Sequence, residues 1–170
     1  MKNHEFSIVS SSETESAWVD AKIDEFNRKE FSFTGKQLET PMNYVVKEQN
    51  LVVAGIKSCF YLGEVVSIGV LFVDEKYRNK GLGRHLLSKV ENEARIMGAK
   101  LAHLYAFDQT KDFYLKHGYE IFAVLKNCPK TGHRCYYLKK NLMSHKKEIE
   151  KINSPINREE SEEKTMKISH

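Results

Sequence analysis

The sequence contains few of the residues that would place it among disulfide-stabilised or membrane-spanning proteins. Its three cysteines, Cys59, Cys128 and Cys135, are an odd number and too few for a disulfide scaffold. No apolar run reaches the roughly 18 residues that mark a membrane-spanning helix. The N-terminal segment lacks the continuous apolar stretch of a secretory signal. We therefore expect a soluble, cytoplasmic protein that has no membrane partner.

A strong excess of one charge is also missing. The 27 basic and 23 acidic side chains give a net charge of +4, too weak an excess to indicate a nucleic-acid partner. With 41% hydrophobic residues in 170, the chain can bury one substantial core. Residues 143–170 differ, because six basic side chains balance six acidic ones and no aromatic residue occurs there. We expect one domain over residues 1–142 and a charged tail over residues 143–170, partly helical or disordered.

The hydrophobic periodicity predicts a mixed α/β domain. Ser12 and Glu15 have the spacing of a capping box at the start of a helix. Two further helices are predicted, one from Gly81 to Gly98 and one over residues 110–117. Strands are predicted over residues 6–9, 43–48, 51–61, 65–73, 101–107, 119–125 and 135–139. A strand, a helix and a strand in succession imply one parallel pair inside an otherwise antiparallel sheet.

Residues 66–87 are the most informative stretch, because a strand-like run enters the loop Arg78-x-x-Gly81-x-Gly83 and a helix begins there. Glycines let the backbone approach a ligand closely, and a helix N-terminus offers unpaired N–H groups to phosphate. Lys80 and Arg84 add positive charge. A tight turn with solvated cations is the alternative interpretation. A dinucleotide fingerprint and a P-loop fit less well, since the third glycine of the first and the Gly-Lys-Ser/Thr of the second are missing.

These elements resemble the acetyl-CoA motif of the GNAT N-acetyltransferase superfamily. DFYLKHGYEIF at residues 112–122 resembles the family's helix-to-strand element, and CPKTGHRCYYLKKNL at residues 128–142 resembles the ending of a bacterial subgroup. Order and spacing agree from about Phe6 to Leu142. The resemblance implies a GNAT-like fold, in which a mixed, mostly antiparallel sheet with a central, splayed parallel strand pair is flanked by helices.

The resemblance also implies acetyl-CoA as cosubstrate. In the family the pantetheine arm pairs with the strand before the loop, and the pyrophosphate lies on the loop N–H groups. The implied cofactor-binding residues are Leu71, Phe72, Val73, Arg78, Asn79, Lys80, Gly81, Leu82, Gly83, Arg84, Gln109 and Phe113. Gln109 would hydrogen-bond the pantetheine or orient Tyr114, with helix capping as its alternative role. Gly69 predicts a bulge whose N–H can hold the thioester oxygen, unless it only accommodates a bulky neighbour.

Two residues are candidates for proton transfer. Tyr114 matches the family tyrosine that donates a proton to the departing thiolate, with a packing role as the alternative. Some family members carry an acidic base at positions that match Ser67 or Gly69, and neither residue is acidic here. His103 has a suitable intrinsic pKa for a base. The base stays open, because Asp108, Glu64 and a water chain are comparable candidates.

The resulting hypothesis is acetyl transfer to a primary amine of a small molecule or protein by direct attack. No cysteine lies where the thioester is expected, which disfavours a covalent intermediate. A non-catalytic acyl-CoA sensor or partner module is the main alternative, and a nucleotide-binding interaction domain is a weaker one. Cys128, His133 and Cys135 lack a second cysteine pair, so no metal is expected. The family commonly forms homodimers, but nothing in this sequence fixes the oligomeric state.

Overall fold

The computed structural model describes residues 7–32 and 38–143, and the chain divides into two compact units, Met1–Leu38 and Glu39–His170. The first unit contains helix α1 (Glu13–Glu30). Ser12 and Glu15 cap it reciprocally through side chain and backbone, which confirms the predicted capping box. The strand predicted over residues 6–9 is wrong for its described part, because residues 7–9 pair with no described strand. The tail predicted after residue 143 lies outside the described residues.

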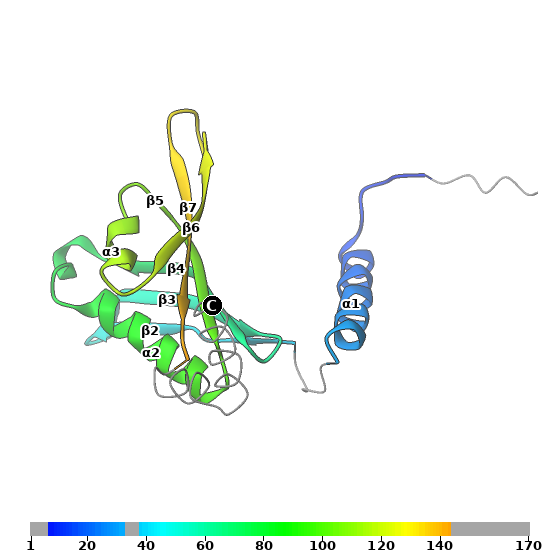
Figure 1. Cartoon of the computed structure of the whole chain (residues 1–170), viewed down its shortest axis with the longest axis horizontal. Coiled ribbons are helices and arrows are strands. Elements are labelled where there is room, and N and C mark those ends of the chain that lie inside the picture. Colours follow the sequence, from blue (N-terminus) through cyan, green and yellow to red (C-terminus); the bar gives the residue numbers. More distant parts are fainter. Residues whose placement is uncertain (1–6, 33–37, 144–170) are drawn as a thin grey trace, which may run out of the picture. The chain divides into compact units, whose positions relative to one another are not determined.

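Within its described residues, 39–143, the second unit is built on one sheet of seven strands in the order β1-β3-β4-β5-β7-β6, with β2 also pairing with β3 (Figure 1). The strands are β1 (Glu39–Pro41), β2 (Tyr44–Glu48), β3 (Leu51–Tyr61), β4 (Val65–Val73), β5 (Leu101–Phe107), β6 (Glu120–Lys126) and β7 (Arg134–Asn141). Among these described strands, only β4 and β5 pair in parallel, and the other neighbours are antiparallel. The predicted mixed sheet with one central parallel pair is therefore confirmed.

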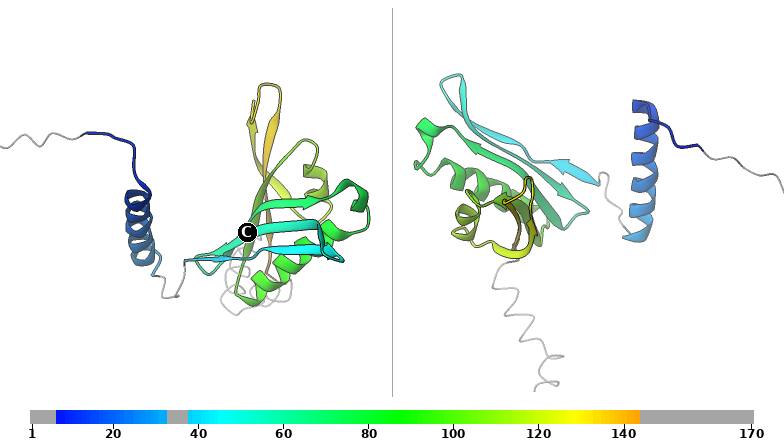
Figure 2. Two further views of the ribbon diagram at one scale, coloured as in Figure 1. Left: turned by 180° about the vertical axis from the view of Figure 1, so that it is seen from behind. Right: turned by 90° about the horizontal axis from the view of Figure 1, so that it is seen from above.

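Helix α2 (Leu82–Ile96) supplies most of the helical cover of this sheet and lies along one of its faces (Figure 2). Its buried apolar side chains are Leu86, Leu87, Val90 and Ala94, and they pack over β3 and β4. The helix ends just before Gly98, whose φ of 105° is a conformation that side-chain-bearing residues rarely adopt. A short 3₁₀ helix, η1 (Glu75–Tyr77), and helix α3 (Lys111–Leu115) complete the unit.

The parallel strands β4 and β5 pair only over their first halves, Val65–Ile68 with Leu101–Leu104. Beyond these residues β4 pairs only with β3, and β5 only with β7. The backbone groups of residues 71–73 that point toward β5 consequently have no strand partner there. The two strands diverge at this point, as the resemblance implied.

A bulge marks the point of divergence. The register between β3 and β4 shifts at Lys57/Ser58 and leaves Gly69 without an opposite residue, which confirms the predicted bulge. A Cβ built on Gly69 would meet only the Lys57 carbonyl oxygen, at 3.6 Å, which is an ordinary contact. Accommodation of a bulky neighbour therefore does not explain this glycine.

Candidate active site

A cleft of about 820 Å³ lies between the end of β4, the start of α2 and helix α3. Its size is typical of small-molecule and cofactor sites. The cleft is lined by Leu71, Phe72, Val73, Tyr77, Arg78, Asn79, Gly81, Leu82, Gly83, Arg84, Gln109, Thr110, Phe113, Tyr114 and His117. The structure thus brings together all the residues implied to bind acetyl-CoA except Lys80, and places Tyr114 among them.

Lys80 stands apart from the cleft. Its ammonium nitrogen lies 4.9 Å from the centre of the Tyr77 ring, a cation–π contact. The residues on either side, Asn79 with φ of 61° and Gly81 with φ of 81°, turn the chain sharply around it. A position inside the glycine loop therefore does not by itself bring a side chain into the cleft.

The N-terminus of α2 forms one wall of the cleft and is open to an anion. Gly81 occupies the N-cap position, no side chain caps this end, and the first turn carries no acidic residue. The first-turn N–H groups, from Leu82 to Arg84, therefore lack the side-chain partners that most helices provide. The positive end of the helix dipole adds to their attraction for phosphate.

Arg78 braces the loop that leads to this helix. Its Nε donates to the Val73 carbonyl oxygen over 3.1 Å, and its Nη1 lies 3.2 Å from the Glu75 carboxylate. Both bonds tie the loop to the end of β4 and to the 3₁₀ turn. In this structure Arg78 thus holds the shape of the anion-binding loop as well as lining the cleft.

Gly83 lies where the first turn of α2 faces the Phe113 side chain of α3. A Cβ built there would lie 3.3 Å from Phe113 Cζ and 3.7 Å from Val73 Cγ2. The Phe113 ring continues into an aromatic cluster, 5.0 Å from the Tyr114 ring and 4.4 Å from the His117 ring between centroids. Phe113 therefore both packs against the helix and forms cleft wall, and a side chain at position 83 would have to shift its ring by a few tenths of an ångström.

Tyr114 is 8% exposed, and it is among the residues that line the cleft. Its hydroxyl forms no hydrogen bond with any residue in the part of the chain that the structure describes. Burial raises the pKa of Tyr114 above its ordinary value, so the phenol stays protonated at neutral pH. A protonated, unengaged hydroxyl at a cleft wall is suited to donate a proton.

His103 lies outside the cleft, on the sheet face opposite the buried side chains of Ala102 and Leu104. Its Nε2 and the Tyr61 hydroxyl are joined by a hydrogen bond of 2.7 Å. Burial lowers the pKa of His103 below 6.5, which keeps the ring neutral at neutral pH. The residue pairs with Ser67, one position before β4 and β5 separate.

This lowered pKa gives the stability a pH dependence. Below pH 6.5 the unfolded chain binds a proton at residue 103 more readily than the folded chain. The free energy of unfolding is therefore expected to fall as the pH decreases from 6.5 toward the folded-state pKa of His103. Urea denaturation at about pH 7.5 and about pH 5 should show a smaller fall in His103→Gln than in the parent chain. An equal fall in both proteins would contradict this assignment.

The other base candidates are engaged elsewhere. Asp108 accepts a hydrogen bond of 2.7 Å from the Tyr136 hydroxyl. Glu64 precedes β4, at the end opposite the cleft, and pairs with Lys100. Like His103, neither residue lines the cleft.

Sequence reasoning missed His117 as a lining residue. Its Nδ1 lies 2.6 Å from the Phe113 carbonyl oxygen, so Nδ1 carries the proton and the bond fixes the ring. The helical spacing of four residues from Phe113 was the available signal. Tyr77 and Thr110, which also line the cleft, were missed as well.

Within residues 7–32 and 38–143 no three His, Cys, Asp or Glu side chains gather as a metal site would require. Among the helices of the same residues, none is both long and apolar enough to cross a membrane.

Comparison with known proteins agrees with this architecture. A family model described as an acetyltransferase (GNAT) domain matches residues 41–121. The crystal structure of an acetyltransferase from Bacillus cereus is 28% identical, with a TM-score of 0.68 over 80% of this chain and 97% of that chain. The aminoglycoside 6'-N-acetyltransferase from Enterococcus faecium is 15% identical, with a TM-score of 0.56 over 81% of this chain and 98% of that chain. At that identity the second likeness concerns the fold alone. A search of curated proteins found no significant match.

The splayed strand pair, the bulge and the glycine loop at a helix N-terminus define the chain as an acetyltransferase of mixed α/β architecture. Over residues 41–121 the chain is similar to the GNAT acetyltransferase domain, and its fold is similar to that of the Bacillus cereus acetyltransferase.

Proposed function

We propose that this protein transfers the acetyl group of acetyl-CoA to a primary amine of a small molecule or protein by direct attack. The observation that carries the proposal is the cleft itself, which combines unpaired strand backbone, an uncapped helix N-terminus and a protonated tyrosine. An aminoglycoside 6'-N-acetyltransferase with a similar fold, at 15% identity and a TM-score of 0.57, has been crystallised in complex with coenzyme A. That complex supports the assignment of the cosubstrate.

In this proposal the cosubstrate lies along the cleft. The outward backbone groups of residues 71–73 pair with the pantetheine amides, as a neighbouring strand would. The pyrophosphate accepts hydrogen bonds from the first-turn N–H groups of α2, next to Arg84. The thioester then lies near the bulge at Gly69, where a backbone N–H can stabilise the charge that develops on its oxygen.

The reaction itself needs a neutral amine, a polarised carbonyl and a proton for the leaving group. The amine lone pair attacks the thioester carbon to form the C–N bond, and the C–S bond breaks. Tyr114 donates its proton to the departing thiolate and regains one from solvent. The attacking nitrogen loses a proton to a base, for which we propose His103, which is neutral and lies beside the point of strand divergence.

A non-catalytic acyl-CoA sensor is the second candidate. The observation that favours it is the absence of a carboxylate at both Ser67 and Gly69, the two strand positions where a base was sought. A sensor would bind acetyl-CoA in the same cleft and release no CoA when amines are added.

One experiment separates the two functions. Acetyl-CoA is titrated into the full-length protein by calorimetry, and CoA release is then measured with a thiol reagent across a panel of polyamines, aminoglycosides and lysine peptides. Saturable binding with amine-dependent CoA release is the expected result. Binding without release by any amine favours the sensor, and no binding by folded protein excludes both.

A further inference from the structure

We infer that a second, smaller cavity beside the cleft is an anion subsite that binds the phosphomonoester of CoA, the phosphate on its ribose. This inference rests on the proposed function, because it assigns a further group of the same cosubstrate. It predicts that the protein discriminates CoA from dephospho-CoA, which lacks only that phosphate.

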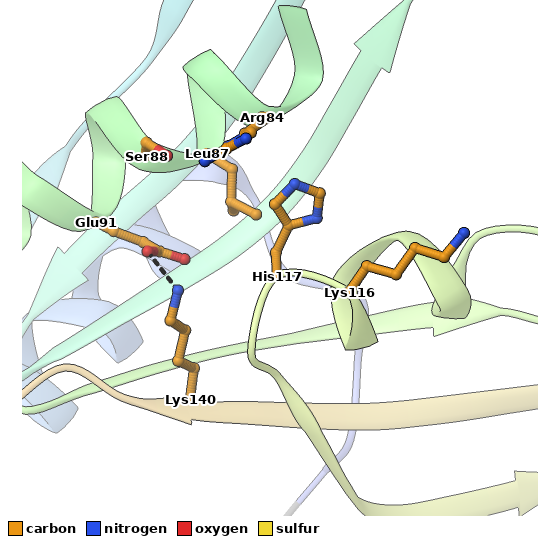
Figure 3. A pocket seen from close by; sticks show the side chains of 7 residues that line it. All are labelled: Arg84, Leu87, Ser88, Glu91, Lys116, His117 and Lys140. Carbon is orange, nitrogen blue, oxygen red and sulfur yellow. Dashed lines mark hydrogen bonds and ion pairs between the residues drawn. The ribbon is translucent and has the colours of Figure 1, made fainter. Parts of the chain in front are cut away.

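The cavity has a volume of about 370 Å³ and lies between α2, the end of α3 and β7 (Figure 3). Arg84 and His117 line both this cavity and the cleft, so the two spaces adjoin. Its other polar lining residues are Ser88, Glu91, Lys116 and Lys140. A ligand on the helix N-terminus can therefore reach this cavity past Arg84 without leaving the protein surface.

The lining charges favour an anion. The side chains of Arg84 and Lys116 form no ion pair with any residue of the described part of the chain. Lys140 is neutralised by Glu91, with 2.7 Å between its Nζ and Glu91 Oε2. The lining residues thus carry an excess of two positive charges, with the Lys116 side chain directed away from the Glu91–Lys140 pair (Figure 3). A phosphate dianion is the group that matches two such cations.

Glu91 also lines the cavity, and its negative charge is compensated by two cations. The residue is 4% exposed, and its Oε2 also lies 3.6 Å from the Arg95 guanidinium. One carboxylate is therefore shared by two cations, Lys140 and Arg95. The pair with Lys140 joins the middle of α2 to β7 and makes the base of the cavity rigid (Figure 3).

His117 is held at the boundary between the two spaces. Its Nδ1–H donates to the Phe113 carbonyl oxygen over 2.6 Å, which orients the ring and leaves Nε2 as its free nitrogen. Ser88, on the next turn of α2 after Arg84, adds a hydroxyl donor to the wall. The cavity thus offers donors of several kinds around a space that is large enough to hold a phosphate group.

The test compares CoA with dephospho-CoA as calorimetric ligands of the full-length protein. We expect the parent chain to bind CoA at least about 10-fold more tightly than dephospho-CoA. Lys116→Glu should reduce this preference by about 10-fold, while the affinity for dephospho-CoA changes by less than about 2-fold. The matched control is Lys126→Glu on β6, which makes the same charge change at an exposed position outside both cavities and should leave the preference intact.

The possible outcomes are distinct. Equal affinity of the parent chain for CoA and dephospho-CoA overturns the subsite and leaves the proposed function standing. A Lys116→Glu variant that weakens both ligands equally also overturns the subsite, since the effect then comes from overall charge. Inorganic phosphate is also titrated alone. If it binds while the two CoA forms bind alike, the cavity is a site for free phosphate and not for CoA. Failure of both CoA forms to bind overturns the proposed function together with the subsite.

Discussion

Gly83→Asp is expected to weaken acetyl-CoA binding at least about 100-fold while the protein stays folded. The substitution places a carboxylate in the first turn of α2, where the proposed pyrophosphate would accept its hydrogen bonds. Like charges about 4 Å apart at a protein surface repel by about 4 kcal/mol, more than a 100-fold loss requires. The Cβ also meets Phe113 at 3.3 Å and pushes that ring into the cleft.

The stability of this variant should change little, which makes the binding loss interpretable. An acidic side chain in a first helical turn interacts favourably with the helix dipole and with free N–H groups. The crowding against Phe113 is relieved by a shift of a few tenths of an ångström in a ring that borders open space. Thermal unfolding measured beside the calorimetry checks this point.

Gly83→Asn is the matched control, because it adds the same volume without the charge. We expect it to weaken binding by only about 10-fold, through the Phe113 contact alone. Equal losses in the two variants would mean that shape, and not an anion at the helix N-terminus, decides binding. Unchanged binding in Gly83→Asp would place the cosubstrate elsewhere.

The sequence predicted the central part of the fold well because its signals there are local. Strands β3, β4 and β5 have the predicted bounds, since turn residues or a helix end flank each apolar run. β1 was missed because it has three residues and ends at Pro41, too short for any periodicity. The strand predicted over residues 6–9 has alternating polar and apolar residues, but its described part pairs with no described strand. A β-strand forms only when its backbone hydrogen-bonds to a neighbouring strand.

The candidate site was predictable for a similar reason. The loop at residues 78–84 and the element around Tyr114 are each contiguous in sequence, and each carries its own pattern. The smaller cavity was not predictable, because Glu91 and Lys140 are 49 positions apart and meet only through the packing of α2 on β7. The Lys80 side chain lies over the Tyr77 ring and does not line the cleft, which the sequence did not indicate.

Tyr114→Phe is expected to lower kcat at least about 100-fold with whichever amine of the panel supports turnover. Removing the hydroxyl takes away the only group of the cleft to which we assign proton donation to the thiolate. The ring, and with it the packing against Phe113 and Tyr119, is retained. Acetyl-CoA affinity and the free energy of unfolding should therefore stay close to those of the parent chain. Steady-state kinetics and calorimetry on the same preparation measure both quantities.

The neighbouring Tyr119→Phe is the control that isolates the position of the hydroxyl. Tyr119 is also a buried tyrosine, but it does not line the cleft, and its hydroxyl has no hydrogen-bond partner in the described part of the chain. Its hydroxyl lies beside the Glu91 carboxylate and away from the cleft, so kcat should not change when it is removed. A similar kcat loss in both variants would point to ring packing as the cause. An unchanged kcat in Tyr114→Phe would transfer the role of acid to water.

The pH profile adds a second criterion for the same residue. Burial raises the pKa of Tyr114 above its ordinary value of 10.0, so the phenol remains a proton donor throughout the neutral and mildly alkaline range. Below about pH 10, ionisation of Tyr114 should therefore cause no fall in the kcat of the parent chain. In this range the pH dependence of kcat should have the same shape in the parent chain and in Tyr114→Phe. A fall near neutral pH that disappears in Tyr114→Phe would require an ionised phenol there. The burial of this side chain opposes that state, so such a profile would overturn the assignment of Tyr114 as a neutral acid.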